Sequence, residues 1–368
     1  MSDQNWESTK VIRAPGATEA PLLEVTDLIT HFKTPRGVAR AVDGVTFTLE
    51  RGKTLGIVGE SGSGKTVLSR SIMGLIEGKN VIRTGSVKFE GKEISSGEAI
   101  RHAWGTDMSM IFQDPMTALN PVMKAGKQIT ESLRKNLDMD KGEANDTAVA
   151  LLKSVGIPSP EQRVKAYPHE LSGGMRQRVM IAIALACGPK LLFADEPTTA
   201  LDVTVQAQIL DLLQEQQRER FMSVILVTHD LGVVAGRADE IMVMYAGQVV
   251  EKASARTLFA DMRHPYTHSL LQSIPKLSDP SHTRLEAIPG RPPDIVNPPK
   301  GCKFAPRCKY AQDRCHEENP DLTEGPSGGH VYRCFYPVVG GSNGGGSTPI
   351  KLNGSGDSPV SSITPQEA

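Results

Sequence analysis

Short apolar runs, separated by turn residues, recur through much of this chain. Their length and composition are typical of buried strands, which we expect at residues 54–58, 108–112, 191–195 and 223–227. Apolar positions at helical spacing predict a core-facing helix at 203–218, and the residues after the first run, 67–73, can also form a helix. Strands that alternate with helices predict an α/β fold.

Three stretches depart from this alternation. Residues 116–170 suggest helices instead, at 131–135 and 146–155, with Pro158 and Pro160 as breaks after them. Residues 1–21 show little periodicity, and we expect a flexible leader. Residues 339–368 are rich in Gly, Ser and Pro, which predicts a disordered tail.

Size and charge narrow the class of protein. The 368 residues suffice for two or three packed units. With 41 basic and 42 acidic residues the net charge is −1, so no basic surplus points to nucleic acid. The longest apolar run spans only residues 179–187, whereas a membrane helix needs ~20 residues. The N-terminus lacks the pattern of a secretory signal, so we expect a cytosolic chain.

A phosphate-binding motif follows the first predicted strand. The sequence GESGSGKT at 59–66 has the form G-x-x-x-x-G-K-[ST], and its context disfavours a chance match in a turn. The glycines let backbone N–H groups converge on phosphate oxygens beside a helix N-terminus. Lys65 would reach the β- and γ-phosphates, and Thr66 would offer its hydroxyl to Mg²⁺. The predicted nucleotide-binding residues of this loop are Gly59, Glu60, Ser61, Gly62, Ser63, Gly64, Lys65 and Thr66.

Two adjacent carboxylates end the predicted strand at 191–195. Ligands bind at the carboxyl ends of strands in open α/β sheets, so Asp195 is placed to hold Mg²⁺. Glu196 follows directly and can polarise an attacking water as a general base. The alternative is an ordinary polar loop start before Pro197, which the phosphate loop in the same chain disfavours.

Further motifs follow in a fixed order, and over residues 22–270 the chain resembles the ATP-binding-cassette (ABC) ATPases. The sequence LSGGM at 171–175 resembles their signature motif, and Gln113 matches the Q-loop. Asp202 matches the D-loop and His229 the switch histidine. A glutamine in a loop is commonly just solvated, and a lone histidine at a strand end is commonly structural. The roles assigned to Gln113 and His229 therefore depend on the order of the motifs.

The resemblance implies a P-loop NTPase fold: a RecA-like core, an antiparallel β part and an α-helical subdomain at about 116–185, all within residues 22–262. Ser172 is a suitable N-cap for a helix opened by Gly173 and Gly174, whose N-terminus favours an anion. In the family this end grips the nucleotide of the opposite subunit in a head-to-tail dimer.

The resemblance also implies the remaining roles. Lys65, Glu196 and His229 would be catalytic, and Thr66, Gln113 and Asp195 would arrange Mg²⁺ and water. The aromatic residue that stacks on adenine in the family corresponds to Phe32.

Four of the five cysteines cluster near the C-terminus. Cys187 lies alone in an apolar predicted helix, where we expect it in the core. Disulfides are disfavoured in the cytosol, so four clustered thiols point to a metal site. Their spacings are wider than those usual for zinc, and an iron–sulfur cluster also takes four thiolates, so spacing alone leaves both open. The cysteines concerned are Cys302, Cys308, Cys315 and Cys334.

A second resemblance covers this region. The sequences at 264–270, 288–293 and 301–308 (HPYTHSL, IPGRPP and GCKFAPRC) resemble the C-terminal region of oligopeptide and dipeptide permease ATPases. The resemblance implies a small Cys-rich extension at 263–338 whose four cysteines bind a [4Fe–4S] cluster. Zn²⁺ is the alternative, and reduced metal-free thiols are a third.

Together the resemblances imply the ATPase subunit of an importer for oligopeptides or dipeptides at the cytoplasmic face of the cell membrane. Its partners would be a second ATPase subunit, expected to be a paralogue, two transmembrane permease subunits and an extracytoplasmic solute-binding protein. Nickel, glutathione or another solute is an alternative cargo. A soluble ABC ATPase acting on nucleic acid or ribosomes is a rival, as is a non-hydrolysing cassette, which the presence of both Glu196 and His229 disfavours.

Overall fold

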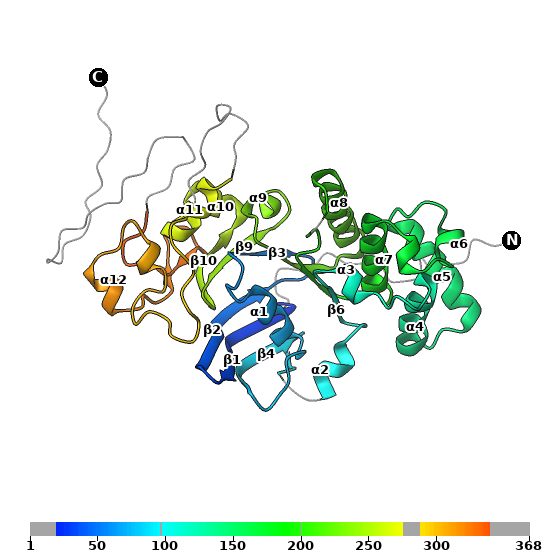
Figure 1. Ribbon diagram of the computed structural model, residues 1–368, viewed down its shortest axis with the longest axis horizontal. Coiled ribbons are helices and arrows are strands. Elements are labelled where there is room, and N and C mark those ends of the chain that lie inside the picture. Colours follow the sequence, from blue (N-terminus) through cyan, green and yellow to red (C-terminus); the bar gives the residue numbers. More distant parts are fainter. Residues whose placement is uncertain (1–19, 96–97, 200, 275–287, 339–368) are drawn as a thin grey trace, which may run out of the picture.

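A large mixed sheet runs through the middle of the molecule (Figure 1). The computed structural model describes residues 20–95, 98–199, 201–274 and 288–338. The predicted tail, most of the predicted leader and Ala200 of the D-loop lie outside these residues.

This sheet has eight strands in the order β11-β12-β10-β9-β3-β8-β7-β6. The five from β9 to β6 are parallel neighbours, and the other three add on antiparallel at one edge. The strands are β3 (Thr54–Val58), β6 (Met108–Ile111), β7 (Leu191–Asp195), β8 (Ser223–Thr228), β9 (Glu240–Tyr245), β10 (Gln248–Ser254), β11 (Thr323–Glu324) and β12 (Val331–Tyr332). The four predicted strands are therefore confirmed, and their carboxyl ends meet at one edge.

A second, antiparallel sheet has the order β2-β1-β4-β5. It is the antiparallel part that the sequence led us to expect. Its strands are β1 (Leu23–Thr34), β2 (Gly37–Leu49), β4 (Val81–Phe89) and β5 (Lys92–Glu93).

The large sheet separates two hydrophobic cores, because successive side chains of a strand point to opposite faces. On β7, Leu191 and Phe193 pack with the antiparallel sheet and α1 (Lys65–Ile72), whereas Leu192 and Ala194 pack with the helices of the other face. Burial on both faces explains why these strands are continuously apolar.

The expected helical subdomain lies at one end of the molecule (Figure 1). It contains α3 (Pro115–Ala118), α4 (Ala125–Leu137), α5 (Lys141–Ser154), α6 (Pro160–Arg163), a 3-10 turn η1 (Pro168–Glu170) and α7 (Gly173–Leu185). The predicted segments 131–135 and 146–155 fall on α4 and α5, except that Val155 caps the end of α5. The remaining helices of the cassette are α2 (Glu98–Ala103), α8 (Val203–Arg220), α9 (Leu231–Val234) and α10 (Ala255–Ala260).

The C-terminal extension lies at the opposite end and continues the large sheet through β12 and β11. Its helical parts are α11 (Pro265–Gln272), a 3-10 turn η2 (Ala305–Arg307) and α12 (Asp313–Glu317). At the junction, the buried Glu251 of β10 pairs with the buried His330 at 2.9 Å. The extension therefore shares the core of the cassette.

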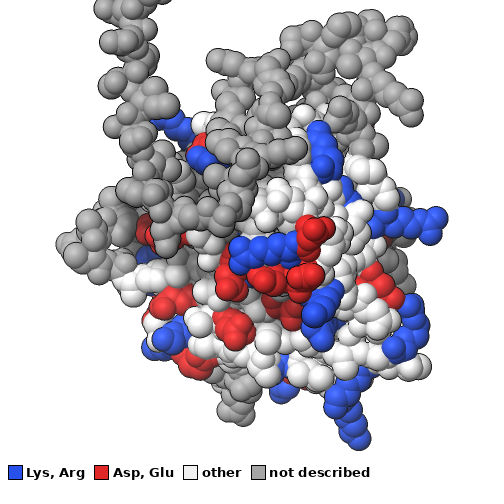
Figure 2. All heavy atoms as spheres, turned by 90° about the vertical axis from the view of Figure 1, so that its left-hand side faces the viewer, with Lys and Arg blue, Asp and Glu red and all other residues white. Residues whose placement is uncertain are grey.

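The face that carries the extension has acidic side chains gathered over its middle, with basic side chains among them (Figure 2). Exposed acids of the extension include Asp313, Glu317 and Glu318 on and after α12, and Glu318 pairs with Arg314 at 2.9 Å. Within the described ranges no helix is long and apolar enough to cross a membrane.

Candidate functional site

The phosphate loop connects the end of β3 to the start of α1, as the motif requires. Gly64 has φ of 101°, a conformation that side-chain-bearing residues rarely adopt. A Cβ at Gly64 would also collide with the carbonyl oxygen of Ala41, and one at Gly59 with that of Met244. The two positions therefore need glycine for close backbone packing, which fixes the loop against β2 and β9.

Lys65 is buried beneath this loop. Its ammonium donates to the carbonyl oxygens of Gly59 at 2.6 Å and Glu60 at 3.0 Å, and to Ser63 Oγ at 3.4 Å. Burial lowers the pKa of Lys65, and the carboxylates of Glu196 and Asp195 counteract this. A cation held by loop carbonyls can exchange them for phosphate oxygens.

Asp195 and Thr66 meet where β7 ends beside α1. The Thr66 hydroxyl donates to Asp195 Oδ1 at 3.0 Å. Asp195 is fully buried, burial raises the pKa of its carboxyl group, and its Oδ2 has no hydrogen-bond partner among the described residues. An unpartnered buried carboxylate oxygen beside a hydroxyl is the hard-oxygen donor set that Mg²⁺ prefers.

Two of the predicted site residues, Gln113 and His229, lie beside Glu196. Gln113 Nε2 and Thr199 Oγ1 each donate to Glu196 Oε2 at 3.0 Å, and His229 Nδ1 lies 3.6 Å from Glu196 Oε1. These residues come from segments that follow β6, β7 and β8, three neighbouring strands. Glu196 has φ of 45°, and its N–H is held by the Val227 carbonyl at 2.9 Å. The structure therefore brings the predicted base, the Q-loop glutamine and the switch histidine together.

The signature and D-loop residues form two neighbouring helix starts. Ser172 caps α7, its Oγ accepting from Met175 N at 3.3 Å, and Asp202 caps α8, its Oδ1 accepting from Val205 N at 2.9 Å. A Cβ at Gly174 would lie 3.1 Å from the Val205 side chain, so the two starts are packed together. Gly173 lies beside Gly174 in the first turn of α7.

Phe32 lies near the end of β1, where it pairs with Ala39 of β2 and Val81 of β4. Its side chain is half-buried. Stacking of adenine on Phe32 stays a prediction.

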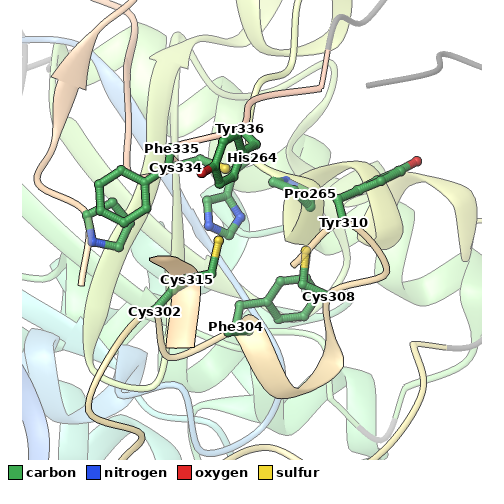
Figure 3. Close-up of a pocket in the computed structure, with 12 residues that line it drawn as sticks. His264, Pro265, Cys302, Phe304, Cys308, Tyr310, Cys315, Cys334, Phe335 and Tyr336 are labelled. Carbon is green, nitrogen blue, oxygen red and sulfur yellow. The ribbon is translucent and has the colours of Figure 1, made fainter. Parts of the chain in front are cut away.

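The four cysteines of the extension line one hollow together with His264 and several aromatic rings (Figure 3). Backbone N–H groups of Phe304, Ala305, Tyr310 and Tyr336 hydrogen-bond to the sulfurs of Cys302, Cys308 and Cys334. Burial raises the pKa of all three thiols, that of Cys308 to about 11 and that of Cys334 to about 12.

Buried sulfurs that accept N–H hydrogen bonds suit a positively charged metal centre, which would keep them as thiolates. The side chains are nevertheless not arranged as metal ligands. Among the described residues no group of three or more His, Cys, Asp or Glu is positioned to hold a metal ion.

Sequence reasoning missed how the extension contacts the phosphate loop. Arg307, which lies between Cys302 and Cys308, forms an ion pair with Glu60 through two N–O contacts of 2.6 and 3.0 Å. The Tyr266 hydroxyl accepts from the Glu60 N–H at 2.8 Å. Both residues lie in segments whose resemblance was noted, but nothing in the sequence pairs them with Glu60. Thr199 was also missed, although it stands three residues after the base.

Two family models match the chain. The one described as "ABC transporter" matches residues 42–199, and the one described as "Oligopeptide/dipeptide transporter, C-terminal region" matches residues 250–315. The oligopeptide transport ATP-binding protein OppD of Bacillus subtilis (strain 168) is 54% identical over 304 residues, covering 82% of this chain and 85% of that protein. The dipeptide transport ATP-binding protein DppD of Escherichia coli (strain K12) is 47% identical over 319 residues, covering 86% and 97%.

Solved structures of ATP-binding cassettes share the fold. The dimeric, post-hydrolysis structure of the cassette MJ0796 bound to ADP and Pi has a TM-score of 0.57 and 26% identity, covering 64% of this chain and 99% of that one. The structure of cbiO1 from Clostridium perfringens, part of the ABC transporter complex cbiONQ, has a TM-score of 0.55 and 28% identity, covering 66% and 91%. The fold expected from the motifs is confirmed.

Proposed function

The chain belongs to the ATP-binding proteins of ABC transporters for oligopeptides and dipeptides, and we propose that its ATPase site is built on Lys65, Asp195 and Glu196. It is an ABC-type ATPase that serves a peptide importer. The observation that supports these residue roles is the convergence of the phosphate loop, Asp195 and Glu196 at the carboxyl ends of parallel strands in one sheet.

In this site the loop N–H groups and Lys65 bind the β- and γ-phosphates, because a buried ammonium is attracted more strongly to phosphate than a solvated one. Glu196 takes up a proton from the attacking water, with Gln113 and His229 positioning that water from either side of the carboxylate. Thr66, Gln113 and Asp195 would hold Mg²⁺, which neutralises charge on the phosphates when bound.

Ser172, Gly173, Gly174 and Asp202 serve the nucleotide of a second ATPase subunit in this proposal. The hydrogen bonds of the Ser172 and Asp202 side chains go to their own helices. The first N–H groups of a helix have no partner within it, so both helix starts suit an anion. A cassette of similar fold is dimeric with ADP and Pi bound, which supports the same arrangement here.

The membrane partners are two permease subunits, with a solute-binding protein on the outer side and this chain on the cytoplasmic face. A docking site is supported by three exposed apolar side chains on and near α3, namely Phe112, Met116 and Val122. Phe112 directly precedes Gln113, so contact with a permease there would reach the catalytic cluster.

The proposed test replaces the base without changing its shape. Glu196→Gln retains the hydrogen bond from Thr199 but accepts no proton, so we expect MgATP to bind as tightly as to the wild type while kcat falls by about 10²-fold or more. Glu215→Gln on the exposed face of α8 is the control and should leave both quantities unchanged. Turnover near the wild-type rate in Glu196→Gln would remove Glu196 as the base.

The four cysteines are proposed to bind a [4Fe–4S] cluster, with Zn²⁺ as the alternative. Their shared hollow and the N–H groups directed at the sulfurs support this. Purified anaerobically, the protein should show broad absorbance near ~400 nm that Cys308→Ser abolishes. Colourless protein with stoichiometric zinc would favour the alternative, and colourless metal-free protein would contradict both.

A further inference from the structure

The segment between Cys302 and Cys308 inserts three side chains into the cassette. Lys303, Phe304 and Arg307 are each more than nine-tenths buried, although two of them carry a charge. Lys303 donates to Asp43 Oδ2 at 2.8 Å and to the Ala246 carbonyl at 3.0 Å. Buried charges of this kind persist only with specific partners, so the segment has one defined position against the cassette.

Arg307 is the most completely held of the three. Besides its two bonds to Glu60, it donates through Nε to the Pro289 carbonyl at 2.8 Å and through Nη1 to the Tyr245 hydroxyl at 3.2 Å. A planar guanidinium bound on several sides cannot turn without losing several hydrogen bonds at once. Arg307 is therefore the fixed member of the pair, and Glu60 is the residue that it holds.

Glu60 is the point where the extension meets the phosphate-binding lysine. Its carboxylate is bound by Arg307, its N–H donates to Tyr266, and its carbonyl accepts from Lys65 Nζ at 3.0 Å and from Ser63 N at 3.2 Å. A shift of Glu60 would therefore change both the direction of the loop N–H groups and the position of the ammonium.

Three packed aromatic rings lie beneath the contact between Arg307 and Glu60. The ring of Tyr266 lies 4.6 Å from that of Tyr245 and 5.3 Å from that of Phe304, and Tyr245 meets Phe304 edge-on at 5.2 Å. These distances are within the range of favourable aromatic pairs. The side chains that contact Glu60 are thus supported by an aromatic cluster to which both the cassette and the extension contribute.

We propose that Arg307 is a positioning residue for nucleotide binding, acting from the Cys-rich extension on the phosphate loop through Glu60. This rests on the proposed ATP site at Lys65. An ion pair that only attached the extension would affect stability, whereas a positioning contact sets the affinity for MgATP as well. The contact also provides a physical route from the cysteine hollow to the nucleotide, because Arg307 immediately precedes Cys308.

The test measures the Kd for MgATP and the thermal midpoint of the full-length chain. We expect Arg307→Met to weaken MgATP binding by about tenfold. Arg307→Lys should weaken it less, because lysine keeps the positive charge but cannot donate two parallel hydrogen bonds to the carboxylate. Glu60→Gln removes the charge and one of the two acceptor oxygens of the same contact from the cassette side, in case Arg307→Met folds poorly. The double variant should bind no more weakly than the weaker single variant.

Two variants serve as controls. Lys303→Met breaks a comparably buried ion pair of the same segment, and should lower the thermal midpoint while leaving the Kd within about twofold of the wild type. Arg101→Met on α2 breaks an exposed arginine–glutamate pair with Glu77 and should change neither quantity.

Unchanged affinity in both Arg307→Met and Glu60→Gln would overturn the proposal. A loss of affinity in Lys303→Met equal to that in Arg307→Met would also overturn it, because the effect would then follow from general loosening of the extension. A separate variant tests the proposed ATP site. If Lys65→Ala bound MgATP as tightly as the wild type, that site would be wrong, whatever the result for Arg307.

Discussion

Two fully buried carboxylates, Asp195 and Glu251, have opposite surroundings. Glu251 accepts from the backbone N–H groups of Arg263 at 2.6 Å and His264 at 3.0 Å, and it pairs with His330 at 2.9 Å. Asp195 accepts one bond from Thr66 and keeps an unpartnered oxygen among the described residues.

The difference separates a structural carboxylate from a ligand-binding one. A buried carboxylate is costly unless hydrogen bonds compensate for its lost hydration. At the junction with the extension the protein itself supplies these bonds, so Glu251 stabilises the fold. At the nucleotide site they are incomplete, so Asp195 is stabilised fully only when a cation binds. Substitutions at the two positions should therefore change stability in opposite directions.

The largest effect is expected at Glu251. Glu251→Gln places an amide N–H₂ against a backbone N–H donor and leaves buried groups unpaired, so we expect the free energy of unfolding to fall by about 3 kcal/mol. Denaturant unfolding measures this. The control is Glu240→Gln on the neighbouring strand, which breaks the partly exposed pair with Lys252 and should cost less than ~1 kcal/mol. Equal losses in the two variants would contradict the structural role of Glu251.

An intermediate effect is expected at Asp43, which joins β2 to Lys303 of the extension. Burial acts to raise the pKa of Asp43, but the hydrogen bond and charge of Lys303, and then His31, bring it below the ordinary 3.8. Asp43→Asn should lower the free energy of unfolding by about 2 kcal/mol at pH 7.

The pH dependence of that effect has a definite sign. Because the pKa of Asp43 is lowered in the folded state, its contribution is fully present above pH 3.8 and is lost as the pH falls through the folded-state value. Thermal midpoints at pH 7, 5 and 3 should therefore differ between wild type and Asp43→Asn by the same amount at the first two values and by less at the third. A constant difference down to pH 3 would rule out the charged pair as its source.

The smallest effect, and the only stabilising one, is expected at Asp195. Burial raises the pKa of this carboxyl group, so its ionised form destabilises the metal-free fold at neutral pH. Asp195→Asn should raise the free energy of unfolding without Mg²⁺ by about 1 kcal/mol, as at other active sites that trade stability for activity. The same variant should lose the extra thermal stability that MgATP gives the wild type. A lower midpoint in metal-free Asp195→Asn would contradict this comparison.

The nucleotide site could be predicted because its chemistry lies in contiguous segments at strand ends. Eight consecutive residues form the phosphate loop, and Asp195 and Glu196 terminate one apolar run. The order of the family motifs implied that Gln113, Glu196 and His229 share a site, and the parallel strands that they follow do bring their carboxyl ends to one edge. The exact partner atoms, including the Thr199 hydroxyl, depend on side-chain conformations that no local pattern specifies.

The extension shows the limit of this reasoning. Its cysteines predicted a common site, and the structure does place all four around one hollow. Its attachment to the cassette was not predictable, because Arg307 and Glu60 are 247 positions apart and His330 and Glu251 are 79 apart. Charged residues are common in loops, and only the few that fold into a buried position acquire an obligatory partner.

The sequence by itself determined the fold class, the ATP-binding motifs and the membership of a peptide-transport branch, since motifs of adjacent residues carry the resemblance to known families and periodicity agrees with it. Only the tertiary structure decided which buried charges are paired within the protein and which keep an atom available to bind a ligand. Pairing requires two segments to meet at hydrogen-bond distance, and that depends on how the extension packs against the sheet edge and the phosphate loop.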